Sequence, residues 1–291
     1  MTKKYSYRLF ILLILFLTAC STIEMQYYRI PEEINIIQKI KTDFIPEKCL
    51  YSSINKTAFI LEKEANIIHI YKNGKKINTI GGLGFTSTSF NKLADITLSP
   101  DGNLLALDSF QKKIKKFDID GKLIAELNLS NFIEPALFAV AVDETYYIYD
   151  NAFKEIIITR TFDQSDWYSF GKFQLSDPSK ISLGKNEITI YDKLKNSTII
   201  FGILGQFQNE IDGNIQIEKQ QQYILKEYFI YHPKSENKFA ISTNKWNDFI
   251  IEDNVILLSD NGIWIGKFTY SEPKAAAAKK VSFFFRCSLK K

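Results

Sequence analysis

The chain has 291 residues, of which 45% are hydrophobic and 14% aromatic, enough apolar material for one large domain or two small ones. Its 37 basic and 33 acidic residues are unevenly placed: residues 20–273 carry 28 basic and 33 acidic residues, whereas residues 274–291 carry six basic residues and no acidic one. Because a nucleic-acid-binding domain needs a basic face, this mildly acidic body argues against a nucleic-acid partner.

The first 20 residues have the organisation of a bacterial lipoprotein signal. A basic start precedes an unbroken apolar run at residues 9–17, which is too short to span a bilayer as a helix but has the length of a signal-peptide core. The run leads into Leu-Thr-Ala-Cys at residues 17–20, which resembles a lipobox. We therefore expect residues 1–19 to be a signal peptide and Cys20 to carry lipid. The alternative is a plain secretory peptide with a chance cysteine.

Lipid on Cys20 is the expected membrane anchor, because no other segment of the sequence is apolar enough to span a membrane. Residues 20–33 then form a tether. Ser21 follows the cysteine, whereas an aspartate at that position retains proteobacterial lipoproteins in the inner membrane. The sequence therefore predicts a location at the outer membrane, on its periplasmic or surface face.

A short apolar run followed by a carboxylate recurs along the chain. The three central copies are 42 residues apart, which is the interval of four-stranded propeller blades. Short alternating strands and frequent turn signals also favour an all-β fold. The carboxylates of the series are Glu62, Asp108, Asp150, Asp192 and Asp260, with His232 at the fifth of six positions.

Six copies of the repeat predict a six-bladed β-propeller of four-stranded antiparallel blades at residues 34–273. The clearest copy places its strands at residues 94–98, 104–107, 114–117 and 123–127, with Asp-Gly turns after the first and third strands. The fifth copy is blurred. The repeat places its second strand at residues 227–231, followed by His232, which is 40 residues after Asp192.

The sixth copy lacks a fourth strand, so a segment from one end of the chain must close the ring. We expect residues 34–40, INIIQKI, to be this outer strand and to pair with residues 263–268, because the segment adjoins the regular repeat. The alternative is residues 281–285, VSFFF, in the basic tail at residues 274–291. We expect the rest of that tail to be disordered.

Residues 79–126 resemble an NHL repeat. They contain a Gly-rich lead-in, a small-hydrophobic inner strand, the Asp101-Gly102 turn, a strand that ends in Asp108, a basic third strand that ends in Phe117-Asp118, and a further glycine turn. The resemblance implies a six-bladed propeller. It also implies a family whose members serve mainly as binding scaffolds and include a few lyases and lactonase-like enzymes.

The sequence offers little support for catalysis. His69 lies in an apolar run and His232 precedes a proline, and we expect both to be structural. Serine-hydrolase, zinc-protease and phosphate-loop motifs are missing from the sequence. Cys49 and Cys287 are isolated, so a zinc site is not expected. They form either one disulfide or, as we favour, two unpaired thiols.

The repeated carboxylates should recur on one face of the disc, because each follows a second strand. One interpretation is an acidic rim that binds a cation or a basic partner. The other, which we favour, is that each carboxylate accepts hydrogen bonds from backbone N–H groups in its own turn. Five turns spread around a ring are too far apart to share one ion.

The sequence as a whole predicts a non-catalytic, lipid-anchored binding or scaffolding module at the bacterial cell envelope. We expect a monomer without a cofactor, whose partner is an envelope protein or a peptide. The alternative is a metal-dependent hydrolase or lyase that uses the central channel of the propeller.

Overall fold

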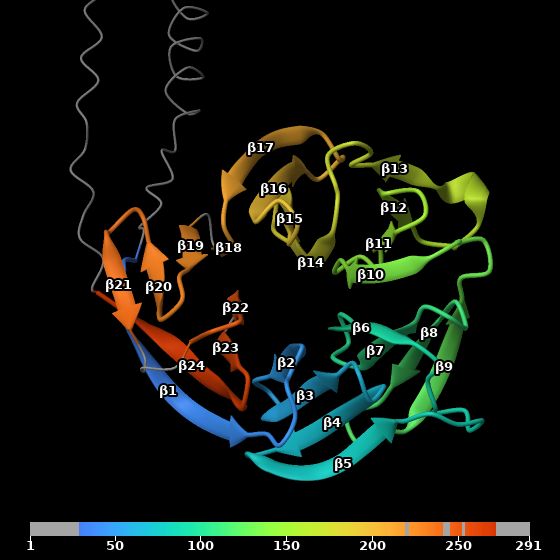
Figure 1. The fold of residues 1–291 in the computed structure, drawn as a ribbon, viewed down its shortest axis with the longest axis horizontal. Coiled ribbons are helices and arrows are strands. Elements are labelled where there is room, and N and C mark those ends of the chain that lie inside the picture. The colour runs from blue at the N-terminus through green and yellow to red at the C-terminus, as the bar shows by residue number, and fades with distance from the viewer. Residues whose placement is uncertain (1–28, 219–220, 241–244, 252–253, 272–291) are drawn as a thin grey trace, which may run out of the picture. The chain divides into compact units, whose positions relative to one another are not determined.

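The computed structural model describes residues 29–218, 221–240, 245–251 and 254–271. The chain divides into two compact units, Glu32–Thr269 and a second unit formed by Met1–Pro31 and Tyr270–Lys291. In the larger unit, the described strands form six antiparallel four-stranded sheets, arranged as blades around a common centre (Figure 1). The predicted all-β six-bladed propeller is confirmed.

The first three blades follow the predicted strand pattern. Blade 1 contains β2 (Lys48–Ser52), β3 (Thr57–Glu62), β4 (Ile67–Lys72) and β5 (Lys75–Gly81). Blade 2 contains β6 (Leu93–Leu98), β7 (Leu104–Asp108), β8 (Lys113–Phe117) and β9 (Leu123–Asn128). Blade 3 contains β10 (Pro135–Val140), β11 (Tyr146–Asp150), β12 (Glu155–Thr159) and β13 (Tyr168–Phe170), with a short 3-10 helix, η1 (Gln164–Asp166), before its outer strand.

The remaining blades complete the ring. Blade 4 contains β14 (Pro178–Leu183), β15 (Glu187–Asp192), β16 (Ser197–Gly202) and β17 (Phe207–Asp212). Blade 5 contains β18 (Ile215–Glu218), β19 (Gln221–Leu225), β20 (Phe229–His232) and β21 (Asn237–Ala240). Blade 6 contains β22 (Asp248–Ile251), β23 (Val255–Ser259), β24 (Gly262–Tyr270) and β1 (Pro31–Lys41).

Blade 5 departs from the predicted phase of the repeat. The spacing places residues 227–231 in a second strand, but this segment forms most of β20, the third strand, and β19 is the second. The prediction is wrong because only Gly213 and Asn214 separate the end of β17 at Asp212 from the start of β18 at Ile215. This short connection makes blade 5 begin earlier in the sequence than the repeat predicts. His232 therefore ends a third strand and is not the counterpart of Asp108.

Hydrophobic side chains of adjacent blades pack against each other. The second strand of each blade has a neighbouring strand on either side and a neighbouring blade on either face, so it is buried. All five residues of β7, for example, are buried. This explains why those strands are continuous apolar runs rather than alternating ones. One cluster packs Phe59 and Ile70 of blade 1 against Ile96 and Phe117 of blade 2, and four similar clusters join other blade pairs.

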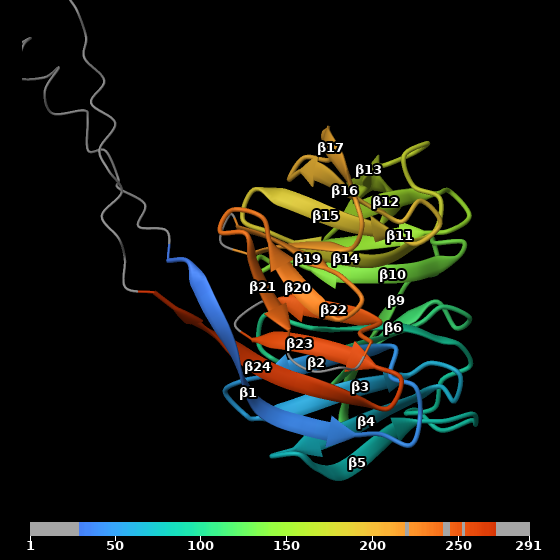
Figure 2. The ribbon, with the colours of Figure 1, turned by 60° about the vertical axis from the view of Figure 1, so that its left-hand side comes forward.

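The ring is closed by β1, as the sequence predicts. The strand order of blade 6 is β1-β24-β23-β22, so the segment at residues 34–40 is its outer strand (Figure 2). Ile34 packs into the cluster between blades 5 and 6, and Ile40 packs into the cluster between blades 6 and 1. The alternative strand at residues 281–285 lies outside the described residues.

The second Asp-Gly turn of blade 2 makes close contact with blade 1. Gly121 has a φ of +91°, and a Cβ at this position would lie 2.9 Å from Cδ1 of Ile70. Glycine is therefore required both by the left-handed backbone and by the space available. Gly102, in the first turn, has a φ of +79° but no heavy atom within 4 Å of a Cβ.

Candidate functional site: the mouth of the central channel

A cavity of about 550 Å³ opens at one end of the central channel. It is lined where the first strands of the blades begin and the second strands end, so its residues lie on one face of the propeller, the mouth face. A second cavity of about 190 Å³ shares Lys48, Lys180 and Ile250 with the first. These three side chains form a throat between the two cavities, and we call the larger one the mouth.

β-Bulges place side chains from equivalent positions in the mouth. The pairing of the first and second strands shifts by one residue between Leu93 and Asp95, and the same shift precedes Leu137 and Lys180 in the next two blades. A bulge of this kind changes the direction of the following side chain. Asp95, Leu137 and Lys180 consequently line the mouth from three successive blades.

Asp95 ties blade 2 to both of its neighbours. Its Oδ1 lies 2.8 Å from Nζ of Lys48 in blade 1, and its Oδ2 accepts a hydrogen bond of 3.0 Å from the backbone N–H of Phe138 in blade 3. The Asp95 side chain is only 5% exposed. A buried carboxylate needs such partners, so Asp95 serves to hold three blades together around the channel.

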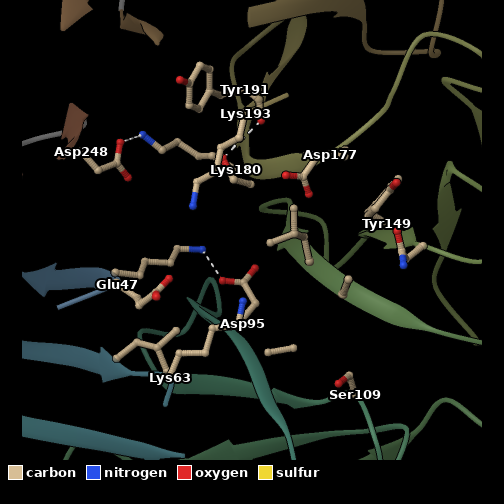
Figure 3. Close-up of a pocket in the computed structure, with 18 of the residues that line it drawn as sticks. Glu47, Lys63, Asp95, Ser109, Tyr149, Asp177, Lys180, Tyr191, Lys193 and Asp248 are labelled. Atoms are coloured by element: carbon tan, nitrogen blue, oxygen red, sulfur yellow. Dashed lines mark hydrogen bonds and ion pairs between the residues drawn. The ribbon is translucent and has the colours of Figure 1, made fainter. Parts of the chain in front are cut away.

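Lys180 makes a second cross-blade connection (Figure 3). Its ammonium pairs with Asp248 of blade 6 and donates a 2.8 Å hydrogen bond to the carbonyl of Phe249. Asn214 of blade 5 also donates to Asp248, at 2.7 Å. Burial lowers the pKa of Lys180, the Asp248 carboxylate opposes this shift, and the nearby Lys48 ammonium adds to it. The charged groups of the throat are therefore paired within the protein.

Three of the predicted carboxylates are fully buried and fasten loops of the mouth face. Asp108, Asp150 and Asp192 each accept backbone N–H groups both from the loop before the inner strand and from the turn after the second strand. The donors to Asp108 are Asn91, Lys92, Phe110 and Gln111; those to Asp150 are Ile133, Glu134 and Ala152; those to Asp192 are Ser176, Asp177 and Lys195. These carboxylates thus fix the shape of the rim.

Glu62 and Asp260 make different contacts. Glu62 is half-buried, and its Oε2 lies 2.7 Å from Nε2 of His69. Asp260 is exposed and accepts a 2.5 Å hydrogen bond from the side chain of Asn247, while the position equivalent to Asp108 in blade 6 is Ser259 at the end of β23. The structure therefore brings three of the five predicted carboxylates into one shared role and leaves two outside it.

Both histidines are buried away from the mouth. His69 is 5% exposed and stacks on Phe44 at 4.1 Å between ring centroids. His232 is fully buried, with Nδ1 2.7 Å from the hydroxyl of Ser235. Burial lowers the pKa of both side chains, although the Glu62 carboxylate partly opposes this for His69. The folded protein therefore favours the neutral form of each.

This burial predicts a loss of stability in mild acid. Histidine in the unfolded chain takes up a proton at about pH 6.5, whereas the folded chain resists protonation. The contribution of the two neutral histidines to the free energy of unfolding is therefore complete above that pH and declines below it. The sequence has only two histidines. We expect the double variant His69→Gln, His232→Gln to show a flatter dependence of unfolding free energy on pH between about 7.5 and 5.5, measured by urea titration. An unchanged slope would assign this dependence to other groups.

The rim of the mouth carries charged side chains that sequence analysis missed. Lys63, Lys92 and Lys193 line it together with Glu47, Glu134 and Asp177. None of these six makes an ion pair with another residue of the described segments. Two of them could have been found in the sequence, because Lys63 and Lys193 each directly follow a carboxylate of the repeat.

Large apolar side chains are exposed on the same face. Ile45 lines the mouth and is 62% exposed. Phe110 and Leu194, in turns after second strands, are 71% and 76% exposed, and Ile133, in the loop before β10, is 54% exposed. These four residues form what we call the apolar fringe.

The described part of the chain shows the following about metal ligands, membrane-spanning helices and cysteines. No group of three or more His, Cys, Asp or Glu residues there is placed to hold a metal ion. In the same residues, no helix is long and apolar enough to span a membrane. Cys49 is buried with a free thiol whose pKa is raised by burial, whereas Cys20 and Cys287 lie outside these residues.

Comparisons with known proteins agree on the architecture. Residues 47–163 match the family DUF5128, described as a 6-bladed beta-propeller. The chain matches none of the curated proteins. It is similar in structure to virginiamycin B lyase from Staphylococcus aureus, at 16% identity and a TM-score of 0.51, covering 75% of this chain and 79% of that one.

Two further structures are similar over most of their length. A Bacteroides fragilis protein described provisionally as exported has 12% identity and a TM-score of 0.55, covering 84% of this chain and 97% of that one. A protein described provisionally as a gluconolactonase has 8% identity and a TM-score of 0.58, covering 82% and 95%. At these identities the similarity establishes the fold alone, because one propeller architecture supports many functions.

Proposed function

We propose that the protein is a lipid-anchored, non-catalytic binding module of the bacterial cell envelope, and that the mouth of its channel is the binding site. Acyl chains on Cys20 attach it to the outer membrane, and residues 20–33 form the tether. The monomeric propeller presents the mouth to an envelope protein or peptide. The observation that supports this most is the mouth itself, with unpaired charges of both signs beside the apolar fringe.

β1 runs toward the mouth face of the propeller. The backbone N–H of Thr42, just after β1, donates to the carbonyl of Asn261 in the turn before β24. That turn lies on the mouth face, since Asp260 binds the mouth residue Asn247. β1 therefore ends at the mouth face, and Glu32 near its start lies toward the opposite face.

The alternative, a metal-dependent hydrolase or lyase, has weaker support. Asp95 and Asp248, the carboxylates that pair with the two throat lysines, are each also held by an amide group. Virginiamycin B lyase is inactivated by replacement of a histidine. The two histidines of this chain are buried and do not line the mouth.

The anchor is tested with Cys20→Ser. Wild-type protein expressed in a bacterium is expected to incorporate labelled fatty acid and to sediment with membranes, because acyl chains provide the apolar attachment. The variant is expected to incorporate no label and to leave the membrane fraction or stay unprocessed. Membrane association without label at Cys20 would overturn the lipid anchor.

The binding site is tested by charge reversal on the two faces. Lys63→Glu with Lys193→Glu changes the mouth, whereas Lys122→Glu with Lys185→Glu changes the same number of exposed lysines in turns of the opposite face. We expect the first pair to reduce capture of a partner from solubilised membranes by about tenfold or more and the second pair to leave it unchanged. Equal effects of the two pairs would contradict a site at the mouth.

A further inference from the structure

The hydroxyl of Tyr149 is buried at the mouth without a hydrogen-bond partner among the described residues. Tyr149 is 2% exposed, and its ring packs in the cluster between blades 3 and 4. The equivalent residue of blade 4 is Tyr191, whose hydroxyl donates to Asn196 at 3.0 Å. An unpaired buried hydroxyl costs free energy. Tyr149 also lines the mouth, so a ligand bound there can complete its hydrogen bonding.

The surroundings of Tyr149 are negative (Figure 3). Burial raises the pKa of Tyr149 to about 12, and the carboxylates of Asp192, Asp177, Asp150 and Glu134 contribute to the shift. Asp150 and Asp192 are occupied by backbone amides, but Asp177 and Glu134 line the mouth. One oxygen of Glu134 accepts a 2.8 Å hydrogen bond from the side chain of Asn151. An ammonium group suits this position, because it can donate to the phenol oxygen while the two carboxylates neutralise its charge.

The opposite side of the mouth carries positive groups. Lys63 follows β3 in blade 1, and Lys92 precedes β6 in blade 2; both line the mouth, and neither makes an ion pair with another described residue. Lys63 lies across the cavity from Tyr149 and Asp177 in Figure 3, with Glu47 beside it. This side has two lysines and one carboxylate, whereas the other side has Asp177, Glu134 and Lys193. The two sides therefore carry opposite net charges, which makes the mouth bipolar.

We propose that the mouth binds a zwitterionic ligand with a free amino group and a free carboxylate, such as a short unmodified peptide. The amino group lies between Tyr149, Asp177 and Glu134, and the carboxylate lies toward Lys63 and Lys92. A volume of about 550 Å³ is within the range of small-ligand sites. An extended tripeptide, about 10 Å long, separates the two charges across such a cavity. This ligand class rests on the proposed function of the mouth as the binding site.

The proposal is tested by calorimetric titration of the detergent-solubilised full-length protein with triglycine, N-acetyl-triglycine and triglycine amide. Triglycine is expected to bind, and blocking either terminus is expected to weaken binding by about tenfold or more. Tyr149→Phe and Asp177→Asn are each expected to weaken triglycine binding by about fivefold or more while changing N-acetyl-triglycine little. Tyr168→Phe, an exposed tyrosine on β13, is the matched control and should change neither.

Two results would overturn this ligand class: equal affinity for the three peptides, or no binding of triglycine up to about 10 mM. The proposed function has a separate readout in the charge-reversal pairs. If Lys63→Glu with Lys193→Glu abolishes capture while the peptides fail to bind, the mouth remains the site and its ligand is not zwitterionic. If triglycine binds as expected while capture is unaffected, the peptide site stands and the proposed partner does not.

Discussion

Deletion of residues 1–40 is expected to turn a soluble propeller into an aggregating one. The deletion removes the outer strand of blade 6 and exposes the edge of β24. It also removes Ile34 and Ile40, each worth about 1.5–3 kcal/mol of burial. An open strand edge recruits other chains, and a ring opened at one seam loses the closure that protects its blades. Soluble yield and thermal midpoint, compared with a chain that begins at residue 21, measure the effect.

Deletion of residues 274–291 should leave the yield and the thermal midpoint unchanged. Gly266→Val offers a test within a complete chain, because a Cβ at Gly266 would lie 2.8 Å from Cγ2 of Ile34 and 3.0 Å from the carbonyl oxygen of Asn35. This variant should lower the midpoint sharply, whereas Ile37→Ala, at a half-exposed position of the same strand, should not. A folded N-terminal deletion beside an aggregated C-terminal one would show that β1 does not close the ring.

Asp150→Ala is expected to destabilise the propeller by about 3–5 kcal/mol. The backbone N–H groups of Ile133, Glu134 and Ala152 lose their common acceptor, and an unsatisfied buried donor costs about 1–3 kcal/mol. This is a large fraction of the stability of a typical domain. Urea unfolding of the purified variant and wild type measures the difference.

Two controls separate the acceptor role from other effects of Asp150→Ala. Asp150→Asn retains one acceptor oxygen and should cost less than the alanine variant. Asp212→Ala removes an exposed aspartate at the end of β17 and should change stability by no more than about 0.5 kcal/mol. If Asp150→Ala and Asp212→Ala were equally mild, the buried carboxylate would not fasten the rim loops.

The propeller could be predicted because each blade repeats the same local pattern. The apolar second strand, its terminal carboxylate and the turn residues are adjacent in the sequence, so the strands of blade 2 fall within one residue of their expected bounds. The closing strand was also predicted, because the strand-like run at residues 34–40 adjoins the regular repeat. Blade 5 was misplaced because a shorter connection after β17 changes the phase without changing the composition of the strands.

The mouth could not be predicted, because its contacts join residues that are far apart in the chain. Lys180 and Asp248 are separated by 68 residues, and Lys48 and Asp95 by 47. Only ring closure brings such pairs together, and no local pattern distinguishes them from solvated charges. Tyr149 had a weak signal: a tyrosine precedes the carboxylate in blades 3 and 4, where Leu61 and Leu107 precede it in blades 1 and 2.

Site-specific photo-crosslinking in living cells tests most directly whether the partner binds at the mouth. A photoreactive phenylalanine analogue at Phe110 or Leu194 places the probe in the apolar fringe, and at Ile54 or Val142 it places the probe in turns of the opposite face; all four positions are highly exposed. A binding site at the mouth predicts one adduct of the same size from both fringe positions and none from the other two. An adduct at Ile54 or Val142, or none at the fringe, would contradict it.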